Sequence, residues 1–287
     1  MGACGSSAPV AQTWGSRGRT PGRFGLPRGI GIRDGFVYVI DRTGRIQKLT
    51  TEGEFVKLWE LPKYDNGTPT GVSFDPDGNL WVPDTHNSRI LRYSPEGELL
   101  DQFGEFGKEP GKFIYPTDMI HDDNDLLYIA EYGNFARIQV FTAEGSFVRT
   151  WGHFGDQPEQ FSRPMAIVAG PDGLLYVADA GNHRIAIYTK QGELQRLFGE
   201  RGDAPGQFDF PYDLDIDAQG HLFVCDYSNH RLQQLTNTGQ FIREWGGLGS
   251  ATGQLFNPWG IALTQTHMYI ADTRNHRIVV YPKPQAA

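Results

Sequence analysis

Several features that would narrow the function are scarce or missing in this sequence. It has two cysteines in 287 residues, Cys4 and Cys225. Cys225 lies in the apolar segment 222–226, where a free cysteine usually packs as a small hydrophobe, so we expect no structural disulfide. No run of 18 or more apolar residues occurs, which excludes a membrane-spanning helix.

Positive charge is also scarce. The chain has 26 Lys and Arg against 34 Asp and Glu, a net charge of −8. Proteins that bind nucleic acids need clustered basic side chains to neutralise phosphates. We therefore expect no nucleic-acid partner.

Common catalytic motifs are missing as well. We find no Gly-x-Ser-x-Gly nucleophile turn, no His-Glu-x-x-His and no glycine-rich phosphate loop ending in Lys-Ser or Lys-Thr. This favours a non-catalytic protein, although a missing motif does not exclude catalysis. No cofactor is expected.

What the chain does contain are turn formers and strand formers. It has 36 Gly, 18 Pro and 13% aromatic residues, and its 39% hydrophobic content is enough for a folded core. A repeat explains this composition, because one unit recurs at steps of 42, 47, 48, 47 and 47 residues. Its opening prolines are Pro27, Pro69, Pro116, Pro164, Pro211 and Pro258.

Each unit holds four runs of strand length, separated by turns such as Asp77-Gly78 and Glu144-Gly145. Four strands at this period are typical of a propeller blade. The outer strands close on an aromatic residue followed by glycine, and such closings or variants occur six times. The sequence therefore predicts an all-β, six-bladed β-propeller of four-stranded antiparallel blades over residues 10–281, with 282–287 as a tail.

The ends of the repeat predict how the ring closes. Trp14-Gly15, the first closing, precedes the first opening proline, whereas the last unit stops after three strands at Tyr281. We expect the N-terminal strand to become the outer strand of the C-terminal blade. Connectors of thirteen residues, such as Gly199 to Pro211, then lead from the rim of one blade to the centre of the next. All of them should lie on one face, here called the connector face.

Residues 1–9 are small and polar, which predicts a flexible linker. Gly2-Ala3-Cys4 resembles the cleavage end of a bacterial lipoprotein signal, without the charged and apolar regions that precede it there. This resemblance implies that Cys4 is lipidated and tethers an extracytoplasmic domain, with no other contact to a membrane. A disordered N-terminus of a cytosolic protein is the alternative.

Three blades carry one signature, Asn182-His183-Arg184, Asn229-His230-Arg231 and Asn275-His276-Arg277, each shortly after an Asp that ends an apolar strand. The signature resembles the NHL repeat, and the resemblance implies a six-bladed propeller. We interpret the recurring Asp and Arg as structural ion pairs. The histidines recur at one blade position and are therefore spread round the ring, which argues against a shared metal site.

Residues that break the repeat near the axis are the candidate site. At the second position after the opening proline most blades have Gly or Ala, but blades three and five have Asp118 and Asp213. Arg28 in blade one either neutralises the two carboxylates as a plug or leaves a polar site with Tyr212 and Trp259 as walls. The two carboxylates suit a cation such as Ca²⁺ or an amine.

Blade three departs from the repeat a second time. Glu131 replaces the repeated Asp, and Tyr132 and Phe135 add aromatic surface. These three residues are candidates for contacting a partner, and a local bulge is the alternative explanation.

Two functions follow. The first is a monomeric, non-catalytic propeller that binds a protein, peptide or glycan on its connector face. The alternative is a metal-dependent hydrolase or lyase with an axial site. The resemblance includes an amidating lyase that holds zinc with inward histidines, but this chain has Asp, Gly or Ala at those positions.

Overall fold

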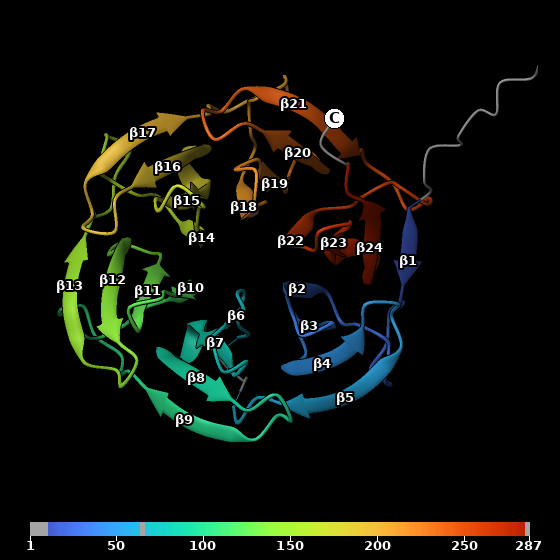
Figure 1. Ribbon diagram of the computed structural model, residues 1–287, viewed down its shortest axis with the longest axis horizontal. Coiled ribbons are helices and arrows are strands. Elements are labelled where there is room, and N and C mark those ends of the chain that lie inside the picture. The colour runs from blue at the N-terminus through green and yellow to red at the C-terminus, as the bar shows by residue number, and fades with distance from the viewer. Residues whose placement is uncertain (1–10, 64–66, 285–287) are drawn as a thin grey trace, which may run out of the picture.

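Six four-stranded antiparallel sheets surround a central axis in the computed structural model (Figure 1). The structure describes residues 11–63 and 67–284. Within them the only helices are three short 3-10 turns, η1 (Thr85–Asn87), η2 (Ala180–Asn182) and η3 (Thr273–Asn275). None of the helices in these ranges is long and apolar enough to span a membrane. The predicted all-β, six-bladed propeller is confirmed.

Each blade runs from the axis to the rim in four strands. The innermost strands are β2 (Pro27–Arg33), β6 (Ser73–Phe74), β10 (Pro116–His121), β14 (Pro164–Ala169), β18 (Pro211–Ile216) and β22 (Pro258–Leu263). The second strands are β3 (Phe36–Asp41), β7 (Leu80–Asp84), β11 (Leu126–Glu131), β15 (Leu175–Asp179), β19 (Leu222–Asp226) and β23 (His267–Asp272). The third strands are β4 (Arg45–Thr50), β8 (Arg89–Tyr93), β12 (Arg137–Thr142), β16 (Arg184–Tyr188), β20 (Arg231–Leu235) and β24 (Arg277–Pro282). The outer strands are β5 (Phe55–Glu60), β9 (Leu99–Phe103), β13 (Phe147–Trp151), β17 (Leu194–Phe198), β21 (Phe241–Gly246) and β1 (Gln12–Trp14).

The ring closes between its two ends, as predicted. β1 pairs antiparallel with β24, with Gln12 opposite Val280 and Trp14 opposite Ile278 (Figure 1). The N-terminal strand thereby supplies the outer strand of the last blade. Closure leaves no blade with an open face, because each sheet packs between two neighbours.

The core consists of the layers between neighbouring blades. Between blades three and four, for example, Ile138 and Val140 pack with Val177 and Ala186, and all four are fully buried. Space is smallest where the innermost strands converge. A Cβ added at Gly260 would lie 2.1 Å from the carbonyl oxygen of Arg28, so a larger residue does not fit there.

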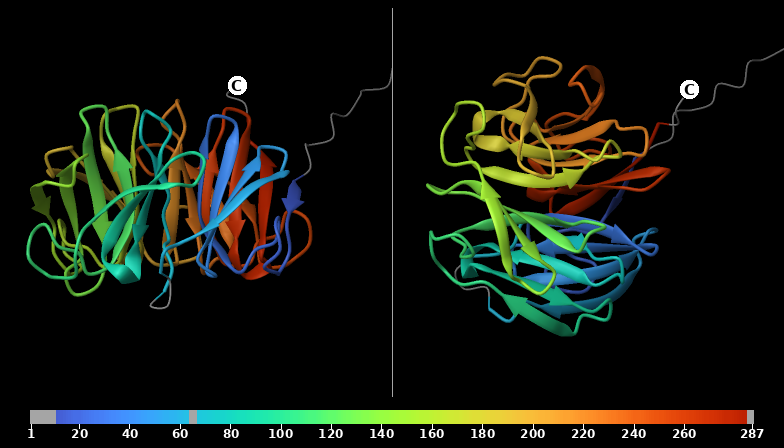
Figure 2. Two further views of the ribbon diagram at one scale, coloured as in Figure 1. Left: turned by 90° about the horizontal axis from the view of Figure 1, so that it is seen from below. Right: turned by 60° about the vertical axis from the view of Figure 1, so that its left-hand side comes forward.

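The loops that join successive blades all lie at one end of the axis (Figure 2). Five of these connectors start at a closing glycine in the left-handed region, as at Gly152 with φ +80°, and the connector between blades one and two follows Glu60 instead. A Cβ at Gly152 would lie 2.4 Å from the ring of Phe161, which is fully buried under the connector. The turns between second and third strands, with η1 to η3, share this connector face. The hairpins that follow the innermost strands lie at the opposite end, here called the hairpin face.

Candidate functional site

The NHL signature turns build the scaffold. In blade five, Asp226 is fully buried and accepts hydrogen bonds from Arg231 Nε (2.9 Å), Asn229 Nδ2 (2.8 Å) and the backbone N–H of Asp209 (2.7 Å). Asp179 and Asp272 accept the same three bonds in their blades. The structural interpretation of the recurring Asp and Arg is confirmed.

The signature histidines link neighbouring blades. Nδ1 of His230 accepts the backbone N–H of Asn257 (3.1 Å), and Nδ1 of His276 accepts that of Leu26 (3.1 Å). Burial lowers the pKa of both imidazoles. The neutral ring is the form that accepts these bonds, so the histidines act as inter-blade hydrogen-bond acceptors.

Glu131 was expected to contact a partner, and the structure corrects this. Its side chain is fully buried; it accepts the backbone N–H of Ile114 (2.9 Å) and pairs with Arg137 and Gln139. It therefore performs in blade three the scaffold role that Asp performs elsewhere. The other two candidates keep exposed surface, since Phe135 is 39% exposed and Tyr132 is half-buried.

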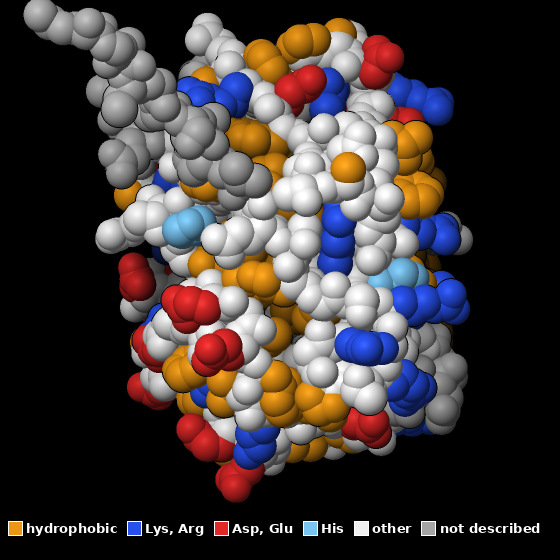
Figure 3. All heavy atoms as spheres, turned by 90° about the vertical axis from the view of Figure 1, so that its right-hand side faces the viewer, with side chains coloured by type: hydrophobic (Ala, Val, Ile, Leu, Met, Phe, Trp, Pro, Cys, Tyr) orange, Lys and Arg blue, Asp and Glu red, His pale blue; other side chains and the backbone are white. Residues whose placement is uncertain are grey.

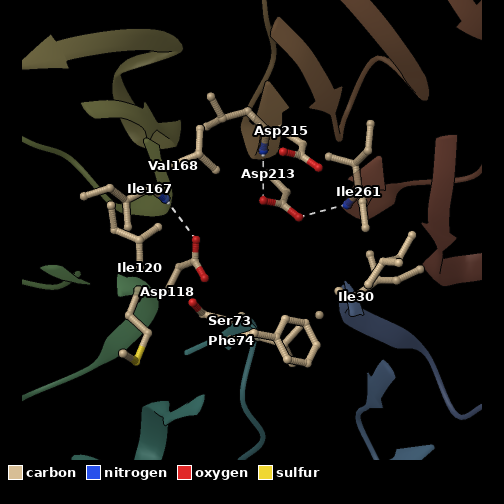
Figure 4. A pocket seen from close by; sticks show the side chains of 18 of the residues that line it. Ile30, Ser73, Phe74, Asp118, Ile120, Ile167, Val168, Asp213, Asp215 and Ile261 are labelled. Atoms are coloured by element: carbon tan, nitrogen blue, oxygen red, sulfur yellow. Dashed lines mark hydrogen bonds between the residues drawn. The ribbon is translucent and has the colours of Figure 1, made fainter. Parts of the chain in front are cut away.

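A cavity of about 160 Å³ lies along the axis and is lined by all six innermost strands (Figure 4). Asp118 from β10 and Asp213 from β18 point into it, as the sequence predicts. A third carboxylate, Asp215, lines the same cavity. Sequence comparison missed Asp215, although strand alternation places it two residues after Asp213 on the same side of β18.

Each of these carboxylates holds the neighbouring blade. Asp118 accepts the backbone N–H of Ile167 (2.9 Å), Asp213 that of Ile261 (2.9 Å) and Asp215 that of Leu263 (2.8 Å) (Figure 4). The innermost strand has no strand beyond it to pair with, so its inward N–H groups need such acceptors.

Burial raises the pKa of all three carboxyl groups. The pKa of Asp118 is about 7 and that of Asp215 about 6; for Asp213 burial and the charge of Asp118 raise the pKa well above its usual value. Backbone hydrogen bonds oppose the shift at each group but do not cancel it. The cavity therefore favours protonated carboxyl groups at mildly acidic pH.

The carboxylates of Asp118 and Asp213 do not fit the Ca²⁺ ion expected from the sequence. Ca²⁺ takes six to eight oxygen ligands, whereas Asp118 uses one carboxylate oxygen and Asp213 uses both to accept backbone N–H groups. Across residues 11–63 and 67–284, no three His, Cys, Asp or Glu side chains come together as metal ligands.

Arg28 does not join the two aspartates, which corrects the expected Arg-Asp-Asp plug. Its guanidinium lies 4.4 Å from the ring centroid of Trp259, and its Nη1 donates to Thr68 Oγ1 at 3.4 Å. None of the residues lining the acidic cavity is Arg28, Tyr212 or Trp259. These residues instead form a second cluster at the connector end of the axis.

This cluster, here called the axial ring, takes side chains from all six blades in a chain of contacts. Tyr212 contacts Trp259 (centroids 4.5 Å) and carries the guanidinium of Arg163 over its ring (5.1 Å). Arg163 also lies over Tyr132 (5.6 Å), which stacks on Tyr115 at 4.8 Å. The members of the axial ring are Arg28, His86, Tyr115, Tyr132, Arg163, Tyr212 and Trp259.

The two arginines of the axial ring have no acidic partner. Among the described residues, no carboxylate lies within ion-pair distance of Arg28 or Arg163, and the Nε of each is buried without a hydrogen-bond partner. Burial, together with the charges of Arg42 and Arg163, lowers the pKa of Arg28 to about 10. Arg28 therefore remains cationic at neutral pH.

The comparison of the blades missed Arg163 and Tyr115 because they directly precede the opening proline, whereas the residues compared follow it. The same position holds Leu26, Phe210 and Asn257 in other blades. Arg163, Leu26, Phe210 and Asn257 share a left-handed backbone, with φ 65° at Arg163. The backbone there follows the repeat, and only the side chain of Arg163 departs from it.

The predictions for the N-terminus lie outside the described residues. Residues 1–9 and Cys4 are among them, so the lipid anchor stays a prediction that the mass of the protein isolated from a bacterial host would test. Cys225 is a buried free thiol, consistent with its expected packing role.

Family and structure comparisons agree on the repeat. Four segments match the NHL repeat, residues 67–93, 161–188, 208–235 and 257–281. The chain is 31% identical over 74 residues to Protein brain tumor of Drosophila melanogaster, covering 25% of this chain and 7% of that protein. It is 34% identical over 132 residues to peptidyl-glycine alpha-amidating monooxygenase B of Xenopus laevis, covering 40% of this chain and 15% of that protein. The match thus spans a small part of either relative.

Solved structures share the fold at low identity. A streptogramin B lyase superposes with a TM-score of 0.67 at 17% identity, covering 95% of this chain and 97% of that one. A gluconolactonase of Xanthomonas campestris gives 0.69 at 14%, covering 98% of both chains, and an auxiliary nutrient binding protein of Bacteroides ovatus gives 0.70 at 16%, covering 96% and 77%. With four matched repeats, three signature turns and six sheets in a closed ring, this chain carries NHL repeats and is a six-bladed β-propeller.

Proposed function

We propose that this chain is a non-catalytic binding protein that recognises a protein, peptide or glycan on its connector face, with the axial ring as the recognition site. The observation that carries the proposal is the pair of arginines, Arg28 and Arg163, that lie among aromatic rings without an acidic partner. The three carboxylates of the acidic cavity each accept a backbone N–H that holds the fold. The two arginines of the axial ring have no acidic partner, and departures of this kind are typical of functional sites.

The surroundings of the ring support binding by this face. Phe106 and Phe154 are 74% and 53% exposed on adjacent connectors, and Phe135 is exposed on the turn between them. Aromatic residues and arginine are enriched at the energetic centres of protein interfaces. On the rim near β1, Lys and Arg side chains gather toward one edge and acidic side chains toward the other (Figure 3).

The alternative is an enzyme with an axial site, as a metal-dependent hydrolase or lyase. The acidic cavity with Asp118 and Asp213 favours it, and a lyase and a gluconolactonase share the fold. Elemental analysis of the purified protein, with a thermal melt before and after chelator, tests this alternative. A stoichiometric ion that is lost together with stability, and that Asp213→Asn no longer binds, would favour the enzyme.

The binding proposal is tested by screening the wild-type protein against a random peptide library and a glycan array. Arg163→Ala should lose the selected ligands. Arg201→Ala is the matched control, because Arg201 is an exposed arginine on the same face, outside the ring. Ligands that bind both variants as well as the wild type, or no ligand at all, would contradict the proposal.

A further inference from the structure

The axial ring places two cations opposite each other. Arg28 lies in β2 of blade one, and Arg163 directly precedes β14 of blade four. Blades one and four face each other across the axis of a six-bladed ring (Figure 1). The charge of Arg163 reaches Arg28 strongly enough to help lower its pKa. The two guanidiniums therefore bracket the connector end of the axis.

The buried arginines of the molecule show what the fold requires. Arg45 pairs with Asp41, Arg137 with Glu131 and Arg231 with Asp226, each beside a connector whose carbonyl groups accept further bonds. A buried cation without such partners is destabilising. Arg28 and Arg163 are only partly buried. Aromatic faces supply part of the compensation, but the buried Nε of each has no hydrogen-bond partner and neither guanidinium has a counter-charge.

The chemistry of the missing partner follows from these donors and walls. A guanidinium presents paired N–H donors that match the two oxygens of a carboxylate. Tyr132, Tyr212 and Trp259 line the same place with flat apolar rings. The protein carries a net charge of −8, and aromatic faces are themselves electronegative. A singly charged anion fits these surroundings better than a phosphate dianion or a polyanion.

We infer that the axial ring binds a carboxylate group carried by an aromatic or apolar moiety, held between Arg28 and Arg163. This inference rests on the proposed function and gives its ligand class. In a peptide partner the group is an acidic residue beside an aromatic one, and in a small ligand it is an aryl or alkyl carboxylate. A phosphate group also accepts paired hydrogen bonds from a guanidinium, so the test must distinguish carboxylate ligands from phosphate ligands.

The test uses four small probes that share a phenyl ring and differ in the charge they carry, with binding followed by saturation-transfer NMR on the whole chain. The probes are 3-phenylpropionate, its neutral analogue 3-phenylpropionamide, the cation 3-phenylpropylamine, and phenyl phosphate. We expect 3-phenylpropionate to bind at least tenfold more tightly than the amide or the amine, and more tightly than phenyl phosphate.

Variants locate the site. Arg163→Gln should weaken 3-phenylpropionate binding at least tenfold, and Arg28→Gln should do the same. Arg163→Lys keeps the positive charge but lacks the paired N–H donors of a guanidinium, so it should recover part of the affinity. Arg201→Gln, on the same face but outside the ring, should stay within twofold of the wild type. Circular dichroism and the melting temperature show whether each variant is folded.

The outcomes separate the inference from the function it rests on. If the amide binds as well as the carboxylate and Arg163→Gln weakens both, the ring is a binding site but the carboxylate inference is wrong. If phenyl phosphate binds most tightly and needs both arginines, the ligand class is wrong. If no probe binds, or if the arginine variants bind 3-phenylpropionate as tightly as the wild type, the inference fails. The library screen then decides whether the connector face binds any ligand.

Discussion

The two ends of the central axis carry opposite charges, and the fold accounts for only one of them. Toward the hairpin face, Asp118, Asp213 and Asp215 each accept a backbone N–H from the next blade. At the connector face, Arg28 and Arg163 lie against aromatic rings without an acidic partner. Both sets break the repeat near the axis, so departure from the repeat alone does not separate a structural group from a binding group.

The hydrogen-bond partners separate them. An acceptor that holds an otherwise unpaired N–H of an inner strand has a role in an empty propeller. A guanidinium with a buried, unpaired Nε and no counter-charge has no such role, because it adds a desolvation cost to the fold. We therefore interpret the acidic end as part of the ring's construction and the cationic end as its site.

The largest expected effect concerns Glu131, a charged residue under the connector face whose hydrogen-bond partners mark it as structural. Glu131→Ala removes the buried acceptor of Ile114, Arg137 and Gln139, and it leaves Arg137 buried without its counter-charge. We expect a loss of about 3–5 kcal/mol in the free energy of unfolding, measured by urea denaturation.

Phe135→Ala is the matched control for this prediction. Phe135 lies in the turn that follows β11 in the same blade and is 39% exposed, so its truncation should cost less than about 1 kcal/mol. Glu131→Ala with a stability close to that of Phe135→Ala would show that partner contacts, not hydrogen bonds, explain the charged residues of this face.

Much of the fold was predictable from the sequence, because the period, the opening prolines and the closing aromatic-glycine pairs each fix one feature of a blade. The ring closure followed from Trp14 and Tyr281 alone. The site was predictable only in part. Arg28, Tyr212 and Trp259 were named, but strand alternation sends Arg28 to a different cluster from Asp118 and Asp213.

Two physical reasons explain what the sequence did not show. Arg163 and Tyr115 reach the axis from positions before the proline, where the direction of the side chain depends on a left-handed backbone at Arg163 that no motif announces. Glu131 looks like a change of function, but its longer side chain still reaches the Arg137 guanidinium and the N–H of Ile114. A substitution in a repeat can thus preserve the interaction while changing the residue.

A second prediction uses pH to test the acidic end. The pKa of Asp118 is about 7 in the folded protein, above the usual 3.8. Between pH 4 and 7 the folded state therefore keeps a proton that the unfolded chain has released, so the free energy of unfolding falls as pH rises and levels off above pH 7. Asp118→Asn cannot titrate and still offers an oxygen to Ile167.

The stability of Asp118→Asn relative to the wild type should therefore rise from pH 4 to pH 7, by on the order of 3 kcal/mol. Thermal or urea unfolding across this range measures the difference. Asp123→Asn is the control, since Asp123 is exposed in the hairpin after β10, and it should parallel the wild type. His230 and His276 act in the opposite direction, because their lowered pKa makes the free energy of unfolding fall as the pH drops below about 6.5. This contribution is the same in all three proteins. A constant difference across the range would mean that Asp118 is not desolvated.

The smallest expected effect is the sharpest test of the cationic end. Arg28→Met removes a partly buried charge that has no acidic partner, and it keeps a side chain of similar length against Trp259. The lost cation–π contact and hydrogen bond to Thr68 therefore oppose the removed desolvation cost. We expect the free energy of unfolding to stay within about 1 kcal/mol of the wild type. Arg89→Met, which breaks a 2.8 Å ion pair with the buried Asp84, should instead cost about 3 kcal/mol by the same measurement. If Arg28→Met were as destabilising as Arg89→Met, the fold itself would need Arg28, and the contrast between the two ends of the axis would disappear. A stable Arg28→Met protein shows that the propeller carries this arginine for something outside its own structure.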